Sequence, residues 1–132
     1  MSDGTNPFIL IARITVKEGK VEEYLKIADE ADKAVEMSEL GMLFHNFDAD
    51  PNDPYKFVWS EIYRRSADFI AHANNPPVQN YIEKHDDLAN HFSIEIYGNV
   101  SDEVVKKISD MEVPFQHFKT TSVGYVRTEH FV

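Results

Sequence analysis

The sequence predicts an α+β fold of the ferredoxin-like type, a split βαβ plait in which an antiparallel sheet carries helices on one face. One observation is the order of its patterns, which read strand, helix, strand, strand, helix, strand. Two interleaved βαβ units have this order of elements. The other observation is size, because 132 residues with 42% hydrophobic content suffice for one core.

The first strand and helix are predicted in the N-terminal part of the chain. Residues 8–16, FILIARITV, are rich in β-branched side chains and contain no turn former, which is typical of a strand. Apolar residues then recur at three- and four-residue spacing from Val21 to Val35, which predicts an amphipathic helix. The helix is expected to end in SELG at 38–41, where Gly41 would give the backbone freedom at the exit.

A hairpin is predicted next. Residues 42–49 and 55–63 have the composition of strands, and the five residues between them, DPNDP, are all turn formers. The simplest arrangement of two strands joined by so short a turn is antiparallel.

The second helical region is predicted to begin at Ser66, which has the side chain of an N-cap. The sequence NNPP at 74–77 interrupts it, and the helical pattern resumes over 78–89. The alternating segment 91–99 then predicts the fourth strand.

We predict a domain over residues 1–100 and a C-terminal extension over 101–132. Within the extension, 101–110 has the pattern of a short helix, and 119–128 could be a fifth strand or an arm. No second set of core residues is visible there, so the extension is expected to be an appendage of the domain.

The predicted first strand is apolar on both faces. Alternation puts Leu10 and Ile14 on one face and Ile9 and Ile11 on the other. Helices cover only one face of a ferredoxin-like sheet, and an exposed apolar sheet surface of this size indicates an interface. Two copies that pack sheet to sheet about a two-fold axis would bury it, so a homodimer through the sheet faces is expected.

The composition argues against several kinds of partner. The chain has 23 acidic and 13 basic residues, a formal net charge of −10. Such a negative field repels phosphate backbones and anionic lipids, so neither nucleic acid nor a membrane is an expected partner. The absence of cysteine excludes disulfides and thiolate metal sites. The six histidines show no metal-binding spacing and no glycine-rich phosphate loop is present, so neither a metal nor another cofactor is expected.

The N-terminal segment carries no targeting pattern. It has no cationic region before the apolar run at 8–16, and Arg13 interrupts that run. We therefore expect neither a signal peptide nor a transmembrane helix, and we expect a cytoplasmic location.

Four segments follow one another in an order typical of a known family. They are VKEGKVEEYL at the end of the first strand, SELGML at the helix exit, the DPNDP turn, and the long stretch FVWSEIYRRSADFIAHANNPPVQNY. In the last of these, Glu61, Tyr63, Phe69 and His72 fall on typical positions. Together the segments resemble the antibiotic biosynthesis monooxygenase (ABM) family of dimeric α+β barrels. The resemblance covers about residues 8–98 and implies a site between the sheet and its own helices.

The resemblance implies several activities. Family members oxidise aromatic polyketides and quinols without a cofactor, degrade haem, or isomerise a phosphorylated sugar. The haem-degrading branch uses an asparagine on the first strand, a tryptophan in the second helical region and a nearby histidine. The corresponding positions hold Ala12, His72 and Ile82, so haem degradation is not expected.

Cofactor-free oxygenation requires a substrate that can itself donate an electron to O₂, such as a phenolate or hydroquinone anion, and a base for the phenolic proton. Histidine suits this role because its ordinary pKa is about 6.5. His72, at the histidine position of the resemblance, is the leading catalytic candidate, and His85, on an apolar helical face, is the second. A structural histidine with a satisfied hydrogen bond is the alternative for each.

Further residues are candidates for binding an aromatic ligand. His45 alternates with apolar residues on the second strand and faces either a pocket or the dimer seam. Buried tyrosines could donate hydrogen bonds to an oxyanion or be purely structural. The substrate-binding candidates are His45, Trp59, Tyr63, Tyr97 and Phe69.

Glu61 lies among aromatic residues on its predicted strand, where an unpaired carboxylate would be costly. It is expected to orient a histidine or to bond an arginine across the dimer, and Arg13 is the arginine expected to pair with it. Both residues are assigned structural or orienting roles.

Three functions are compatible with these residues. The first is a cofactor-independent monooxygenase for a small aromatic or quinol-like molecule. The second is a dimeric ligand-binding protein without turnover. The third is a non-redox enzyme such as an isomerase, and a phosphate-recognising isomerase would need cations in its pocket, for which Arg13, Lys56, Arg64 and Arg65 are close enough along the chain.

Overall fold

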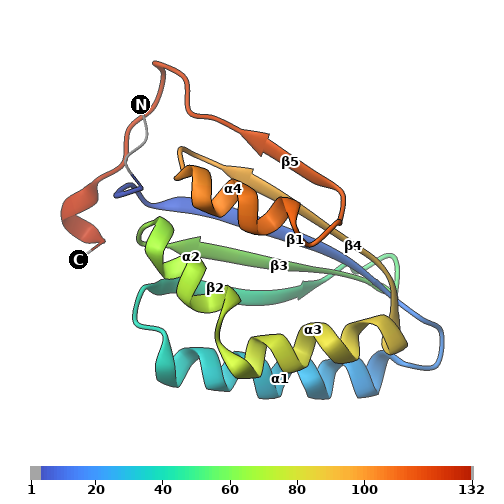
Figure 1. The fold of residues 1–132 in the computed structure, drawn as a ribbon. Helices are drawn as coiled ribbons and strands as arrows, with labels where there is room; N and C mark the ends of the chain where they lie inside the picture. The colour runs from blue at the N-terminus through green and yellow to red at the C-terminus, as the bar shows by residue number, and fades with distance from the viewer. Residues whose placement is uncertain (1–3, 132) are drawn as a thin grey trace.

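A computed structural model describes residues 4–131 as a five-stranded sheet with helices on one face (Figure 1). The elements are β1 (Phe8–Val16), α1 (Val21–Ser38), β2 (Met42–Ala49), β3 (Lys56–Tyr63), α2 (Ser66–Ala73), α3 (Pro76–Leu88), β4 (Ala89–Tyr97), α4 (Asp102–Ser109), β5 (Phe115–Phe118) and the 3₁₀ turn η1 (Thr128–His130). The strand order is β2-β3-β1-β4-β5, and only the β4–β5 pair is parallel. The predicted ferredoxin-like α+β fold is confirmed.

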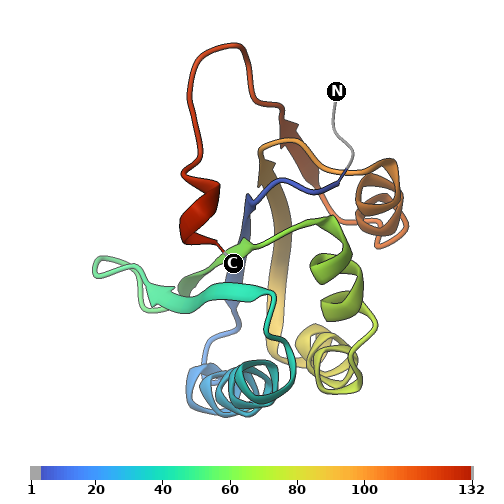
Figure 2. The same cartoon turned by 90° about the vertical axis from the view of Figure 1, so that its left-hand side faces the viewer.

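The sheet separates two environments. In Figure 2 the four helices lie on one side of it, and the segment after β5 passes to the other side. Alternation along β1 buries Leu10 and Ile14 under the helices and turns Ile9 away, with 42% of its surface exposed. We call the side away from the helices the open face.

The extension is part of this fold as far as Phe118. Val104 and Ile108 of α4 are fully buried in the same core as the sheet residues. β5 pairs with β4, which places the fifth strand at Phe115–Phe118 and ahead of the predicted 119–128. Residues 119–128 form an exposed segment without strand pairing. The division of the chain at residue 100 stays a prediction.

Two local expectations were wrong. Ser66 is the first residue of α2 and not its N-cap; its hydroxyl instead accepts a hydrogen bond from the backbone N–H of Ser101 at 3.0 Å. Gly41 does not have a positive φ. Glycine is required at this position because a side chain has no room: a Cβ there would lie 2.0 Å from the carboxyl carbon of Asp68.

Gly41→Ala should therefore destabilise the fold by about 1–3 kcal/mol, since the added methyl group overpacks a filled site. Chemical denaturation of both proteins would measure the loss. In an Asp68→Ala background the methyl group has room, and the cost of Gly41→Ala should become much smaller. An equal cost in both backgrounds would contradict this explanation of Gly41.

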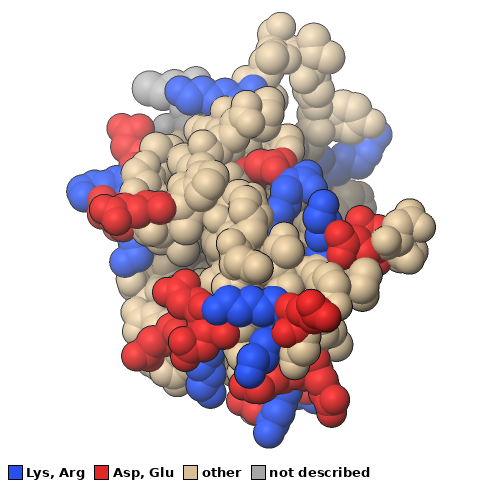
Figure 3. Space-filling model, turned by 90° about the vertical axis from the view of Figure 1, so that its right-hand side faces the viewer, with Lys and Arg blue, Asp and Glu red and all other residues tan. Residues whose placement is uncertain are grey.

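Figure 3 shows one face of the molecule, on which basic and acidic side chains are interspersed towards the end where α1 and α3 lie. No continuous basic patch is visible on this face. Within residues 4–131, no helix has the length and apolar character to span a membrane.

Candidate active site

A cavity of about 260 Å³ lies between the sheet and helices α1 to α4. Most of its wall is apolar, with Leu10 and Ala12 of β1 beneath and Val78 and Ile82 of α3 above. Ligand sites for small molecules usually have 300–1,000 Å³, and an apolar cavity of about 150 Å³ accommodates benzene. This cavity therefore has room for an aromatic ligand of one or two rings.

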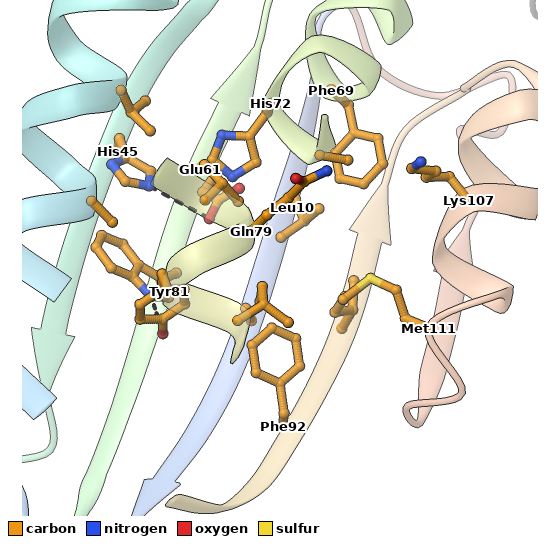
Figure 4. A pocket seen from close by; sticks show the side chains of 18 residues that line it. Leu10, His45, Glu61, Phe69, His72, Gln79, Tyr81, Phe92, Lys107 and Met111 are labelled. Carbon is orange, nitrogen blue, oxygen red and sulfur yellow. Dashed lines mark hydrogen bonds and ion pairs between the residues drawn. The ribbon is translucent and has the colours of Figure 1, made fainter. Parts of the chain in front are cut away.

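The first polar side chain of the cavity wall is His72, which is paired with Glu39. His72 projects from α2, and its Nδ1 lies 2.9 Å from Oε1 of Glu39, directly after α1. Asn75 donates a second hydrogen bond to this carboxylate at 2.8 Å. Within residues 4–131 Nε2 of His72 has no hydrogen-bond partner, and the side chain lines the cavity (Figure 4).

The surroundings of His72 favour its protonated form. Burial alone would lower its pKa, but the hydrogen bond to Glu39 and the charges of Glu61 and Glu39 together raise the pKa above the ordinary value. The pKa of Glu39 is lowered: burial opposes this, and the hydrogen bond to His72 outweighs it together with the charge of His72 and the bond to Asn75. A histidine oriented by a carboxylate and bonded through Nδ1 is suited to exchange a proton at Nε2.

The second polar group is centred on Glu61 of β3. Its carboxylate is buried, accepts a hydrogen bond from the hydroxyl of Tyr63 at 2.6 Å, and lies 3.7 Å from Nε2 of His45. The other ring nitrogen of His45 is 2.8 Å from Asp32, and the imidazole stacks on Trp59 at 4.3 Å between ring centroids. Figure 4 shows Glu61 between the imidazoles of His45 and His72.

A third group consists of aromatic residues beside the cavity. The indole N–H of Trp59 donates to the hydroxyl of Tyr81 at 2.9 Å, and Tyr81 is hydrogen-bonded to the hydroxyl of Tyr24. Nδ1 of His85 lies 2.8 Å from the Tyr24 hydroxyl. Burial lowers the pKa of His85, so its neutral form is favoured. Burial also raises the pKa of both tyrosines, which keeps their protons in place.

The structure brings together five of the residues selected from the sequence and separates the others. The five that line the cavity are His45, Trp59, Glu61, Phe69 and His72. Two others, His85 and Tyr63, are buried behind the wall and hydrogen-bonded there. The catalytic role predicted for His85 and the binding role predicted for Tyr63 stay predictions.

Arg13 and Tyr97 lie on the open face. Arg13 pairs with Glu95 at 2.5 Å, and the hydroxyl of Tyr97 donates to the same carboxylate. The predicted Arg13–Glu61 pair was therefore wrong, because alternation along β1 points Arg13 away from the face that carries Glu61. Tyr97 does not line the cavity, and its predicted role in binding finds no support in this placement.

Several residues of the site were not selected from the sequence. Glu39 was part of the SELGML segment, but no spacing rule links it to a histidine 33 residues further on. Two residues of the cavity wall itself, Lys107 in α4 and Met111 after it, were likewise not selected. They were missed because the extension was expected to lie outside the core.

The cavity wall contains the three positions that distinguish the haem-degrading branch, which hold Ala12, His72 and Ile82. None of the four cations considered for a phosphate site, Arg13, Lys56, Arg64 and Arg65, lines it. Over residues 4–131 no three His, Asp or Glu side chains are grouped so as to hold a metal ion.

The model of the antibiotic biosynthesis monooxygenase family matches residues 7–84 of this chain. The chain belongs to this family. The match includes His72, Glu39 and Glu61 and ends before β4, so Lys107 and Met111 lie outside it. A search among curated proteins found no match.

Solved structures of similar fold come from several bacteria. A Bacteroides thetaiotaomicron protein provisionally named an antibiotic biosynthesis monooxygenase superposes with a TM-score of 0.64 and 24% identity, over 67% of this chain and 85% of its own. PA3566 from Pseudomonas aeruginosa superposes with a TM-score of 0.64 and 23% identity, over 72% of this chain and 95% of its own. A Caulobacter crescentus protein with the same provisional name superposes with a TM-score of 0.66 and 16% identity, over 70% of this chain and 88% of its own. At these identities the likeness concerns the fold.

Proposed function

We propose that this ABM-family protein is a cofactor-independent monooxygenase that acts on a small phenolic or quinol-like aromatic molecule. The observation that carries the proposal is the His72–Glu39 pair at a mostly apolar cavity, in which Nε2 of His72 has no hydrogen-bond partner within residues 4–131. The cavity volume of about 260 Å³ suits a ligand of one or two rings.

The proposed chemistry begins with proton transfer. A bound phenol gives its proton to Nε2 of His72, and the resulting imidazolium is stabilised by Glu39 through Nδ1. The phenolate then donates electrons to O₂. When a ring C–H becomes a quinone carbonyl, the substrate gains one oxygen atom and loses two hydrogen atoms, one from that carbon and one from its hydroxyl group. These two hydrogen atoms leave with the second oxygen atom as water. The substrate thus supplies all the electrons that O₂ accepts, and no external reductant is required.

Oxygen uptake tests the proposal. Purified protein should consume O₂ with some members of a panel of naphthols, anthrones and reduced quinones, with one oxygen atom from ¹⁸O₂ appearing in the product. Ligand binding without O₂ uptake across the panel would instead indicate a binding protein. Conversion of a ligand to an isomer without O₂ uptake would indicate a non-redox enzyme.

The pH dependence of kcat/KM should report the ionisation of His72 in its pair with Glu39. Because the pKa of His72 is raised, the neutral base should be lost as pH falls through an apparent pKa above 6.5. Glu39→Gln removes the charge that helps to raise this pKa, so burial should dominate, the acid limb should move to lower pH, and the maximal rate should fall. Asp29→Asn, on the exposed side of α1, is the control and should leave the profile unchanged. An unmoved limb in Glu39→Gln would contradict this role.

We further propose that the protein is a homodimer through the open face. In a single chain, the open face exposes the large apolar side chains of Ile9, Phe44, Tyr97 and Phe118. Light scattering after size exclusion should give twice the 15.2 kDa of one chain. Ile9→Asp should shift the protein towards the monomer, whereas Met37→Asp, at an exposed position of α1, should not. A monomeric wild type would contradict the proposal.

A further inference from the structure

The cavity has a second polar end, formed by α4 and the residues that follow it. Lys107 and Met111 line the cavity from the side opposite to His45 and His72, with Leu10 and Phe92 between (Figure 4). In Figure 4 the amino group of Lys107 is the part of its side chain nearest the cavity. The two residues lie outside the part of the chain that the family model matches.

Among the residues that the structure describes, no carboxylate pairs with the charge of Lys107. Its ammonium group donates a hydrogen bond to the neutral side-chain oxygen of Asn74 at 2.9 Å. Within residues 4–131 it forms no ion pair, whereas the neighbouring Lys106 pairs with Asp110 at 3.1 Å. Lys107 as a whole is partly buried, and the hydrogen bond of its ammonium group to Asn74 is exposed, so this charge can be reached by a ligand.

Lys107 is the only lysine or arginine that lines the cavity within the described part of the chain. The other ionisable groups of the wall, among them His72 and Glu61, lie at the far end. A ligand that spans the cavity therefore meets a base at one end and a fixed positive charge at the other.

We infer that the substrate is an aromatic molecule with a hydroxyl group at one end and a carboxylate at the other, and that Lys107 binds the carboxylate. An ammonium–carboxylate hydrogen bond is about twice as strong as a neutral one. The apolar middle of the cavity would bind the ring. The inference rests on the proposed function for the role of the hydroxyl end; the carboxylate end depends only on binding.

The net charge of −10 is compatible with this substrate class. Long-range repulsion from exposed acidic groups is screened over roughly 10 Å at ordinary ionic strength. A direct contact with an ammonium group at the cavity wall acts over a much shorter distance and is screened less. A single carboxylate can therefore be bound in a protein that repels polyanions.

Calorimetric titration without O₂ tests the inference separately from turnover. The probes are 4-hydroxybenzoate and 6-hydroxy-2-naphthoate, each compared with its primary amide, which has nearly the same shape and no charge. In wild type at least one carboxylate should bind about ten-fold more tightly than its amide, which corresponds to about 1.4 kcal/mol. Lys107→Met should abolish this preference and leave amide binding within about two-fold, whereas Lys107→Arg should retain it.

Lys106→Met is the matched control, because Lys106 is exposed on the same helix and pairs with Asp110. It should keep the preference of wild type. Equal binding of acid and amide by wild type, failure of both acids to bind, or an undiminished preference in Lys107→Met would each overturn the inference. Carboxylate preference without O₂ uptake would instead refute the proposed oxygenation and leave the inference standing.

Discussion

His72→Ala should lower kcat/KM for the oxidised substrate by about a hundred- to ten-thousand-fold, which is the usual contribution of a positioned acid or base. The imidazole is the group that both contacts a carboxylate, Glu39 at 2.9 Å, and leaves a ring nitrogen at the cavity wall. Without it, a phenol with an ordinary pKa of about 10 stays protonated near neutral pH. Steady-state O₂ consumption at saturating and limiting substrate would measure the change.

Three further measurements separate this role from a structural one. Added imidazole should partly restore turnover in His72→Ala, and raising the pH towards the pKa of the substrate should do the same. Ligand affinity measured without O₂ should change far less than kcat. His91→Ala, at an exposed histidine whose ring is hydrogen-bonded to the side chain of Ser93, should retain wild-type activity. Wild-type turnover by His72→Ala would exclude His72 as the base.

Much of the site could be predicted because it depends on strand alternation. Once β3 was identified, the period of two put Trp59, Glu61 and Tyr63 on one face, and the pairing of β2 with β3 brings His45 opposite Glu61. The same reasoning, extended to Arg13, would have shown that it points to the open face. Opposite charge alone favours an Arg13–Glu61 pair, but the two side chains point to opposite faces of the sheet.

The remaining parts depend on tertiary packing, which has no local signal. The carboxylate of Glu39 reaches His72 only because the end of α1 lies beside α2. Likewise, α4 carries just two fully buried apolar residues, Val104 and Ile108, in a helix of eight. That number is too small to distinguish a core helix from a surface helix by sequence pattern alone.

Ile108→Ala should destabilise the protein by about 2–5 kcal/mol, the usual cost of truncating a buried isoleucine. Ile108 has no exposed surface and belongs to the same core as β1 and β4. Chemical denaturation followed by far-UV circular dichroism would give the free energy of unfolding. Lys106→Ala, exposed on the same helix, should leave it near the wild-type value.

The same experiment bears on the division at residue 100. If residues 101–132 were an appendage, Ile108→Ala would leave the main unfolding transition unchanged, and a chain ending at residue 100 would unfold with the stability of the full chain. We expect the opposite, since the truncation removes Val104, Ile108 and the pairing of β5 with β4. It would also remove the cavity wall that contains Lys107. Stability and ligand preference should therefore be lost together on truncation, whereas Lys107→Met should change the preference alone.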